Sequence, residues 1–313
     1  MILTVTLNTA VDKLYVIDSL RPHEVMRVKE VNNTAGGKGM NVSRVAALAG
    51  EPVIATGFVG GCNGKLFESL ITEKGITKRF TPVQAETRCC INIRDLAENK
   101  STEFLEPGNP VTEGELNRFI ENYETELQKA QVVTISGSMP KGAPTDFYAM
   151  LTRLAQKYHK RVILDTSGTA LQQALPACPT MIKPNADEIE QLLKVNIRSR
   201  GQLIDAARQL HQSGIKIVAV SLGKDGVLVA CDEGIYHGIT PDIPVVNTVG
   251  CGDSMVAGFA VCMARDYSME DTIRYAVAIS TASALTKETG SFRPEDLESL
   301  LPMIKLNKID EKE

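Results

Sequence analysis

The stretch Asn247-Thr248-Val249-Gly250-Cys251-Gly252-Asp253-Ser254 runs without a break into the apolar segment Met255 to Ala264. Two glycines one residue apart let the backbone turn its N–H groups toward one point. A helix that begins there adds unpaired donors and the positive end of its dipole. We therefore expect an anion site, suited to a phosphate, at the start of a buried helix.

An acid is unexpected at an anion site, because its charge repels a bound phosphate. We interpret Asp253 as a general base that takes the proton from a hydroxyl while that hydroxyl attacks the phosphate. The plainer interpretation is a glycine-rich turn in which Asp253 is an ordinary N-cap. Asp253 is thus the candidate catalytic residue, together with the backbone of Gly250, Cys251 and Gly252.

The composition is that of an ordinary soluble globular protein, since 43% of the 313 residues are hydrophobic and 23% are charged. This length fits one large α/β domain with an appendage, or about two domains. No apolar run approaches the ~20 residues of a membrane span. The start, Met1 to Leu7, is β-rich and lacks the basic region of a signal peptide. We expect a cytoplasmic protein that does not bind membranes.

Charge and aromatic content argue against nucleic acid as a partner. The net charge is -4 and there is no tryptophan, and the lysines and arginines form no basic block. The seven cysteines indicate reduced thiols and no disulfide framework. The four histidines are scattered without ligand spacing, so no zinc site is expected. These exclusions favour small-molecule chemistry.

Short β-branched runs alternate with longer helical patterns along most of the chain. The predicted strands are 53–59, 132–135, 162–164 and 217–220, and the predicted helices are 41–49, 64–74, 145–158, 186–193 and 199–213. This alternation is typical of a parallel sheet covered on both faces, in one large α/β domain. Ligands of such sheets collect beyond the carboxyl ends of the strands.

Two β-rich segments without a helical period interrupt this pattern, at about 12–33 and 87–105. The first contains Leu14 to Ile17 and Val25 to Val28. We expect the two segments to pair as a small antiparallel sheet that acts as a lid and excludes water from a reacting phosphate. The alternative is two ordinary edge hairpins. The charged tail, Leu306 to Glu313, is expected to be frayed.

A second glycine-lined helix start, Ala35 to Asn41, contains Lys38 and is also suited to an anion. It is not a Walker A loop, and the Gly250 loop lacks the third glycine of a dinucleotide fingerprint. P-loop and nicotinamide chemistry are therefore disfavoured. By the strand-end rule Asp12 lies near Gly36 and Gly37, where it can bond sugar hydroxyls. The candidate cations for a substrate phosphate are Arg27, Lys38 and Arg88.

Three further loops carry candidate polar groups. Ser136 to Pro140 follows a predicted strand and offers small hydroxyl residues. Asn185 and Glu188, three residues apart at a helix start, can organise waters around Mg²⁺, although acids in a first turn are commonly dipole partners alone. Ser221 to Gly226 follows another strand and can carry a nucleotide on its backbone.

Four motifs in this order resemble those of the ribokinase-like sugar kinases of the phosphofructokinase-B type, over Met1 to about Pro302. They are Thr6-Leu7-Asn8 with Asp12, Gly36-Gly37-Lys38-Gly39 with Asn41, Lys183-Pro184-Asn185 with Glu188, and Val249 to Ser254. The resemblance implies a three-layer α/β/α domain over 1–313, with a mostly parallel sheet and a small β-sheet lid. Within the family the chain resembles the branch that contains tagatose-6-phosphate kinases and 1-phosphofructokinases.

The resemblance also implies roles for single residues. Asp253 is the implied base, and the amides of Gly250, Cys251 and Gly252 form the anion hole. The residues implied to hold the sugar phosphate are Asp12, Arg27, Gly37, Lys38, Asn41, Arg88 and Ser138. Those implied to serve ATP are Lys183, Asn185, Ser221, Gly223, Gly226 and Gly252, with Glu188 acting on Mg²⁺ through water.

Two further expectations concern ions and assembly. The resemblance implies a K⁺ site beside the anion hole, formed by Asn247, Val249 and the loop 287–291. We also expect a homodimer formed through the lid. Two residues depart from the family pattern, because Thr9 replaces the proline usual after the first motif and Cys251 replaces an alanine or serine. The bulkier thiol is expected to alter packing or to make the anion hole oxidisable.

The expected reaction is ATP-dependent phosphorylation of tagatose 6-phosphate to the 1,6-bisphosphate. We choose this sugar because the amino-acid sequences of segments 86–91, 102–106 and 164–171 resemble those of the tagatose-6-phosphate enzymes. The nearest competing function is that of a 1-phosphofructokinase, which acts on fructose 1-phosphate. A non-catalytic sugar-phosphate sensor and a ribose or nucleoside kinase of the same superfamily are more remote candidates.

Overall fold

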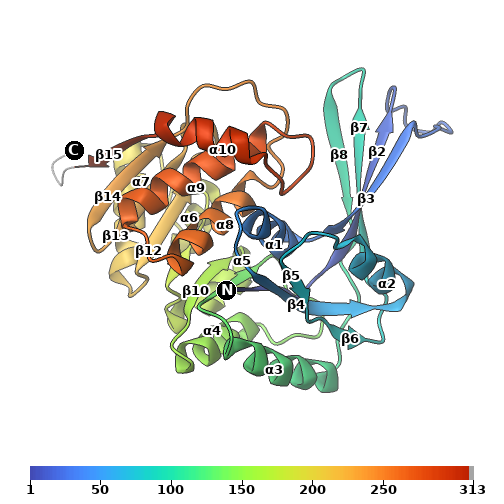
Figure 1. The fold of residues 1–313 in the computed structure, drawn as a ribbon, viewed down its shortest axis with the longest axis horizontal. Helices are drawn as coiled ribbons and strands as arrows, with labels where there is room; N and C mark the ends of the chain where they lie inside the picture. Colours follow the sequence, from blue (N-terminus) through green and yellow to red (C-terminus); the bar gives the residue numbers. More distant parts are fainter. Residues whose placement is uncertain (310–313) are drawn as a thin grey trace.

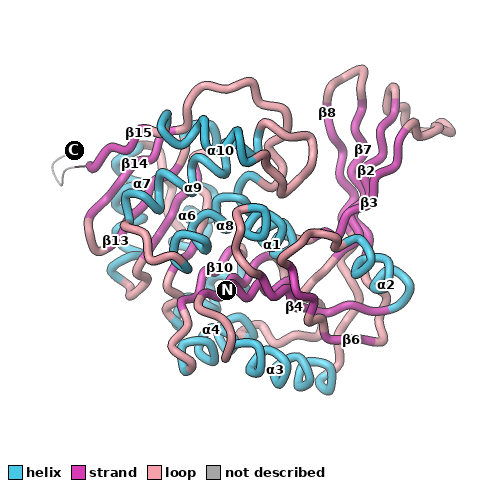
Figure 2. The backbone as a smooth tube through the Cα atoms, viewed as in Figure 1, coloured by secondary structure: helices cyan, strands magenta, loops and turns pink. Residues whose placement is uncertain are grey.

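The computed structural model describes residues 1–309 and contains a central sheet covered by helices on both faces (Figures 1 and 2). The main sheet has the order β15-β14-β13-β12-β11-β10-β9-β1-β4-β5, and β6 pairs with β4. Its strands are β1 (Ile2–Thr6), β4 (Val53–Gly60), β5 (Ile76–Lys78), β6 (Thr81–Val83), β9 (Val132–Ser136), β10 (Arg161–Asp165), β11 (Met181–Ile182), β12 (Ile217–Ser221), β13 (Val227–Cys231), β14 (Gly234–Ile239) and β15 (Lys305–Ile309).

In the main sheet, the neighbouring strands β5, β4, β1, β9, β10, β11 and β12 pair in parallel. The strands β13, β14 and β15 complete the sheet in antiparallel register. β1 shows why the sheet is covered on both faces, since all five of its residues are buried. A strand that is apolar on both faces needs helices on both sides. The predicted mostly parallel, doubly covered sheet is confirmed.

The helices divide between two apolar cores, one on each face of the sheet. The first core takes α3 (Glu113–Leu127), α4 (Phe147–Lys157), α5 (Gly168–Ala174), α6 (Ala186–Leu193) and α7 (Arg200–Gln212). The second takes α1 (Lys38–Leu48), α8 (Cys251–Ala264), α9 (Met269–Ala284) and α10 (Pro294–Leu300). A third, smaller core joins α2 (Gly61–Leu70) to the base of a separate small sheet. The predicted three layers are thus present.

α8 is apolar on nearly every side, as a fully buried helix must be. It packs against the main sheet, α1 and α9. Gly258 permits the closest approach to α9, because a Cβ there would lie 2.7 Å from the Cα of Ala276. This burial fixes the N-terminus of α8, and with it the Gly250 loop, at the carboxyl end of the parallel strands.

The small sheet projects from one end of the molecule, at the upper right of Figure 1. Its order is β3-β2-β7-β8, with strands β2 (Ala10–Ile17), β3 (Glu30–Gly36), β7 (Arg88–Asp95) and β8 (Lys100–Leu105). The expectation of a separate sheet made by the two interrupting segments is confirmed. The expectation that it is antiparallel throughout is wrong, because β2 and β7 pair in parallel. Both strands leave the main domain in the same direction, and each then returns in its own hairpin.

Two boundaries also differ from the sequence-based expectation. Val25 to Val28 lies in the β2–β3 loop, because the hairpin register ends where Val16 pairs with Glu30. The tail expected to be frayed instead begins with β15, which pairs with β14 through Ile309. Leu306 packs against the second core, which ties this strand down. Residues 310–313 lie outside the described part of the chain.

Within residues 1–309, no helix combines the length and the apolar character that crossing a bilayer requires.

Candidate active site

The Gly250 loop forms the N-terminus of α8, as the sequence predicts. Gly250 is the N-cap residue with φ 82°, a left-handed conformation that favours glycine. A Cβ on it would lie 2.8 Å from the Cγ2 of Thr289. No side chain in the described residues caps α8. The amide of Cys251 donates to the carbonyl oxygen of Thr248 at 3.3 Å, so the amides of Gly250 and Gly252 are the ones that the turn leaves to a ligand. The interpretation of Asp253 as the N-cap is wrong, because Gly250 holds that position.

Asp253 is buried just inside the helix, with 6% of its surface exposed. Its Oδ2 accepts a hydrogen bond of 2.8 Å from the Nδ2 of Asn41 on α1. Burial and the negative charge of Asp165 raise the pKa of Asp253 to about 6, against the opposing effects of Lys38, Asn41 and Lys183. A carboxylate with a pKa near neutrality is suited to accept a proton from a hydroxyl.

Asp165, at the end of β10, is a central residue of the site that the sequence reasoning did not single out. It is 2% exposed. Its Oδ2 lies 3.3 Å from the Nζ of Lys38, and its Oδ1 lies 3.4 Å from the Nζ of Lys183. One buried carboxylate therefore joins the lysine of the first glycine loop to the lysine of the Lys183 motif. The available signal was an acid directly after the buried run 162–164.

The two lysines flank the anion loop. Lys183 is buried, and a Cβ on Gly252 would lie 3.4 Å from its Nζ. Burial of Lys38 opposes its charge, but Asp165, Asp253 and Glu188 outweigh this effect and raise its pKa above the ordinary lysine value. The ammonium group of Lys38 therefore stays charged at neutral pH, and Lys183 places a second basic side chain beside the same loop. They offset negative charge where a phosphoryl group would face the first turn of α8.

Asn185 and Glu188 form a capping box at the start of α6. The side chain of Asn185 accepts from the amide of Glu188 at 2.8 Å, and Glu188 Oε2 accepts from the amide of Asn185 at 2.9 Å. The helix-end interpretation of this acid is thus correct as far as it goes. The capping box does not use the second carboxylate oxygen of Glu188. The negative charge of Glu188 raises the pKa of Lys38.

These residues fit a magnesium ion of the kind expected. The part of the chain that the structure describes contains no group of three acids, cysteines or histidines able to hold a metal alone. Mg²⁺ needs few protein oxygens, because it keeps several waters and binds substrate phosphates. Glu188 is half-buried and its charge acts on Lys38, so it can supply one such oxygen through water.

Asp12 and the first glycine loop lie together at the base of the small sheet, as predicted. A Cβ on Gly36 would lie 2.0 Å from the Cγ of Asp12. Burial raises the pKa of Asp12 to about 6, while Arg88, Arg44 and a hydrogen bond from the backbone of Gly37 lower it. The carboxyl group is thus held over the loop, where a hydroxyl group could bond to it.

The remaining substrate candidates are placed unequally. Arg88 donates to the carbonyl oxygens of Asn8 and Glu106, so three of its donors are engaged by the backbone. Ser138 accepts a bond of 3.0 Å from Asn8 Nδ2 and therefore lies near Arg88. Arg27 lies in the exposed loop between β2 and β3, and the structure does not bring it to the others.

The candidate nucleotide loop starts where β12 ends. Ser221 forms an isolated parallel bridge with Asn185, so two of the expected ATP residues are neighbours. Gly223 has open space where a Cβ would be, whereas a Cβ on Gly226 would lie 2.0 Å from the carbonyl oxygen of Gly238. Gly226 therefore lets the loop pack tightly and Gly223 leaves it accessible. A groove of about 850 Å³ beside the loop is lined by Asn185, Ser221 and Lys224, among others.

The segments expected to hold a potassium ion also meet. Asn247 donates from Nδ2 to the carbonyl oxygen of Lys287 at 3.1 Å, and its Oδ1 accepts from the amide of Val249 at 3.0 Å. Asn247 and the loop 287–291 are thus in contact beside the Gly250 loop. Both oxygens named accept hydrogen bonds, so these contacts establish that the segments meet, and the K⁺ site stays a prediction.

The two residues that depart from the family pattern are accommodated. The hydroxyl of Thr9 donates to the carbonyl oxygen of Phe58, which ties the loop after β1 to β4. Cys251 donates its thiol to the carbonyl oxygen of Asn247. Burial and the charge of Asp253 raise the pKa of this thiol to about 11. The thiol therefore stays protonated at neutral pH, which disfavours the oxidation that the sequence suggested.

The pKa of Asp253 leads to a pH prediction. Catalysis needs the ionised form, so kcat/KM should fall about tenfold per pH unit below pH about 6 and stay level from pH 7 to 9, where Lys38 remains charged. Steady-state rates measured from pH 4.5 to 9 test this. A phosphate on the substrate also titrates near pH ~6, so the residual rate of Asp253→Asn is the control. If that variant retains the same acid limb, the limb belongs to the substrate.

Comparison with known proteins agrees with this geometry. Residues 3–296 match the family model for pfkB family carbohydrate kinases. Phosphofructokinase-2 from Escherichia coli, solved in complex with potassium, is 28% identical with a TM-score of 0.90, and the match covers 96% of this chain and 98% of that one. A possible 1-phosphofructokinase from Thermotoga maritima is 27% identical with a TM-score of 0.90, over 99% and 100% of the two chains. A ribokinase from Thermotoga maritima, 21% identical over 96% and 99% of the two chains, shares the fold with a TM-score of 0.78.

The match extends over nearly the whole chain and includes each motif on which the site is built. The family resemblance and the ribokinase-like fold expected from the sequence are confirmed. The chain belongs to the pfkB family of carbohydrate kinases.

Proposed function

We propose that this kinase transfers the γ-phosphoryl group of ATP to a ketohexose monophosphate and forms the 1,6-bisphosphate. The observation that carries this proposal is the placement of Asp253. A buried carboxylate with a pKa of about 6 lies in the first turn of a helix that no side chain in residues 1–309 caps. Lys38 and Lys183 lie beside it, joined through Asp165. This arrangement suits a base that acts between two phosphates.

In the proposed mechanism Asp253 accepts the proton of the attacking sugar hydroxyl. Asn41 holds one carboxylate oxygen of Asp253, which leaves the second oxygen free to face that hydroxyl. The amides of Gly250, Cys251 and Gly252 and the ammonium of Lys183 would bind the transferred group, the amide of Cys251 by giving up its bond to the carbonyl oxygen of Thr248. Bound ATP would supply that group. Glu188 would hold Mg²⁺ through water, and the ion would offset the charge of the phosphates. The small sheet excludes water from the reacting groups.

A phosphorylated sugar is favoured over a free sugar or a nucleoside. Asp12 and the Gly37 loop would hold the sugar hydroxyls, and Lys38 and Arg88 place positive charge on the same side of the site. The similarity to phosphofructokinase-2 and to a possible 1-phosphofructokinase supports the ketohexose phosphate class. Within that class we propose tagatose 6-phosphate, on the resemblance of segments 86–91, 102–106 and 164–171. The competing substrate is fructose 1-phosphate.

Exposed apolar side chains on the small sheet support a homodimer formed through it. Val31 on β3 is 59% exposed and Phe104 on β8 is 56% exposed, and the strand register places both on one face of the sheet. Clustered exposed apolar residues commonly mark a protein interface. Arg27, in the exposed loop between β2 and β3, stays a proposed contact to the sugar phosphate that would reach it from the lid. The contact between Asn247 and the loop 287–291 supports the proposed K⁺ site.

Release of ADP with a panel of sugars tests the reaction. The panel is tagatose 6-phosphate, fructose 1-phosphate, fructose 6-phosphate and ribose, each with Mg²⁺ and either K⁺ or Na⁺. We expect the highest kcat/KM with tagatose 6-phosphate. Preference for fructose 1-phosphate would establish a 1-phosphofructokinase, and equal rates on ribose would overturn the assignment to phosphorylated sugars. Saturable sugar-phosphate binding without any ADP release would indicate the non-catalytic sensor.

A further inference from the structure

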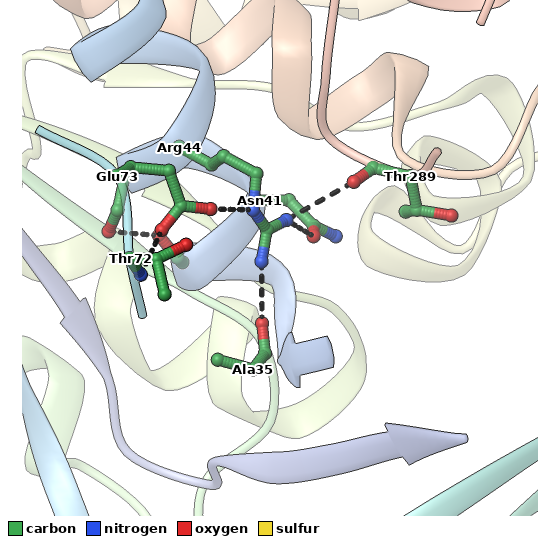
Figure 3. A network of polar contacts seen from close by, with 8 residues as sticks. Ala35, Asn41, Arg44, Thr72, Glu73 and Thr289 are labelled. Atoms are coloured by element: carbon green, nitrogen blue, oxygen red, sulfur yellow. Dashed lines mark hydrogen bonds and ion pairs between the residues drawn. The ribbon is translucent and has the colours of Figure 1, made fainter. Parts of the chain in front are cut away.

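Arg44 is a charged residue of α1, and its side chain is only 12% exposed. Figure 3 shows its guanidinium at the centre of a polar network. Nε lies 2.7 Å from Oε1 of Glu73, and Nη2 donates to the carbonyl oxygen of Ala35 at 2.8 Å. Nη1 donates to Oδ1 of Asn41 at 3.2 Å and to the carbonyl oxygen of Thr289 at 3.1 Å.

These contacts join four segments of the chain. Ala35 lies near the end of β3 in the small sheet, Asn41 belongs to α1, Glu73 follows α2, and Thr289 belongs to the loop beside Gly250. The planar guanidinium is pre-organised for several simultaneous contacts, which a lysine ammonium on a flexible stem cannot reproduce. Arg44 therefore does more than pair with one acid.

The hydrogen-bonding chemistry of arginine fixes the orientation of the Asn41 amide. A guanidinium only donates, so the oxygen of Asn41 must face Arg44. The NH₂ group of Asn41 is then directed to Asp253, where Nδ2 lies 2.8 Å from Oδ2. The reversed amide would place an oxygen against the carboxylate of Asp253. The Thr289 loop limits movement of Asn41 further, since a Cβ on Gly290 would lie 2.7 Å from the Cβ of Asn41.

We propose that Arg44 is a positioning residue for the catalytic base, because it holds Asn41 with its amide NH₂ toward Asp253 and ties the small sheet and the Thr289 loop to this pair. The proposal rests on the kinase function proposed above. The hydrogen-bond partners of Arg44 do not include Asp253. It acts through Asn41, whose hydrogen bond favours the ionised form of Asp253.

Several further charges act on the same carboxyl groups and must be kept constant in a test. Asp253 faces Asp165 from β10, Lys38 from α1, Lys183 from the segment after β11 and the Cys251 thiol of α8. The charge of Arg44 also acts on Asp12. Arg44→Lys preserves that charge and a partner for Glu73, and it removes the fork that reaches both Asn41 and Thr289.

Arg44→Lys should lower kcat about tenfold at pH 7, a loss of the size expected for one hydrogen bond, with KM for ATP changed less than about twofold. The acid limb of the pH–rate profile should move to higher pH, so that the deficit shrinks between pH 7 and 9. In an Asn41→Ala background the same substitution should have no further effect on the limb, because the coupling passes through Asn41.

The matched control is Arg265→Lys. Arg265 has the same kinds of partner, with Nε 2.7 Å from Oε1 of Glu51 and Nη2 donating to the carbonyl oxygen of Ala49 at 2.7 Å. It joins the ends of α8 and α1 away from the site. We expect Arg265→Lys to lower the Tm by about as much as Arg44→Lys does. It should leave kcat and the acid limb of the pH–rate profile unchanged. If Arg44→Lys does not fold, Arg44→Met with Glu73→Leu replaces the ion pair by apolar side chains, a change that proteins often tolerate, and should shift the limb in the same direction.

A second readout does not depend on turnover. The carboxyl ¹³C shift of Asp253, assigned with Asp253→Asn, should titrate at higher pH in Arg44→Lys than in the wild type. A kcat within twofold of wild type, or a lower kcat with an unmoved limb and an unmoved ¹³C titration, overturns the positioning role. A wild-type protein without turnover on any sugar of the panel overturns the proposed function instead, and the ¹³C titration still decides the role of Arg44.

Discussion

Replacing Asp253 by asparagine should lower kcat by about 10²–10⁴-fold and leave ATP binding intact, because the amide keeps the size of the side chain but cannot accept the proton of the attacking hydroxyl. The variant should fold at least as stably as the wild type at pH 7.5. The folded-state pKa of Asp253, about 6, lies above the ordinary value of 3.8. Ionising this group in the folded protein therefore opposes stability at neutral pH, and asparagine removes that effect.

Single-turnover rates, ATP affinity by calorimetry and thermal melts together test this expectation. Asp271→Asn is the matched control, because Asp271 occupies the third position of α9 just as Asp253 occupies the third position of α8. Its partner is the N-cap Ser268 and not a residue of the site. Wild-type turnover by Asp253→Asn would remove Asp253 from the role of base. Loss of ATP binding in that variant would mean that the carboxylate shapes the anion hole itself.

Replacing Asp165 by asparagine should lower the free energy of unfolding by about 3 kcal/mol, because it leaves the buried ammonium of Lys183 without its charge partner. Lys183 is 7% exposed and Asp165 is 2% exposed, so solvent cannot substitute for the lost carboxylate. Lys38 is 44% exposed and contributes less to this loss. Asp266→Asn removes an exposed partner of Arg161 and should change stability by less than about 1 kcal/mol.

Anions give the Asp165 prediction a second, independent outcome. Millimolar ATP or inorganic phosphate should raise the Tm of Asp165→Asn more than that of the wild type, because the two lysines then gain a negative partner. The acid limb of any residual activity should move to lower pH, since Asp165 is one of the groups that raise the pKa of Asp253. Equal stabilisation of variant and wild type by anions would mean that the lysines do not face the anion site.

Most of the main domain could be predicted from local patterns. The buried strands are short β-branched runs, and the start of α6 at Ala186 follows from a capping box visible in the sequence. The small sheet was predicted as a unit, but its parallel β2–β7 pairing was not. Pairing direction depends on where two strands leave the main domain, and that depends on the main sheet itself.

The candidate site divides along the same line. Asp253, Lys38 and Lys183 are found from their glycine loops and motifs, because anion binding at a helix start is a local property of the backbone. Asp165 and Arg44 are not found this way. Asp165 follows an ordinary apolar run, and its partner Lys38 lies 127 residues away in the chain. Arg44 interrupts an apolar run, and its partner Thr289 lies 245 residues away.

Hydrophobic periodicity and the backbone conformations of a few neighbouring residues are local properties, so the amino-acid sequence predicts the fold class, the two glycine-lined helix starts and the acid at one of them. How that acid is held and charged depends on the packed molecule. Burial under α1, the bond from Asn41 and the charges of Asp165, Lys38 and Lys183 set its pKa. Those groups come from separate elements and meet only when the sheet and its helices are packed.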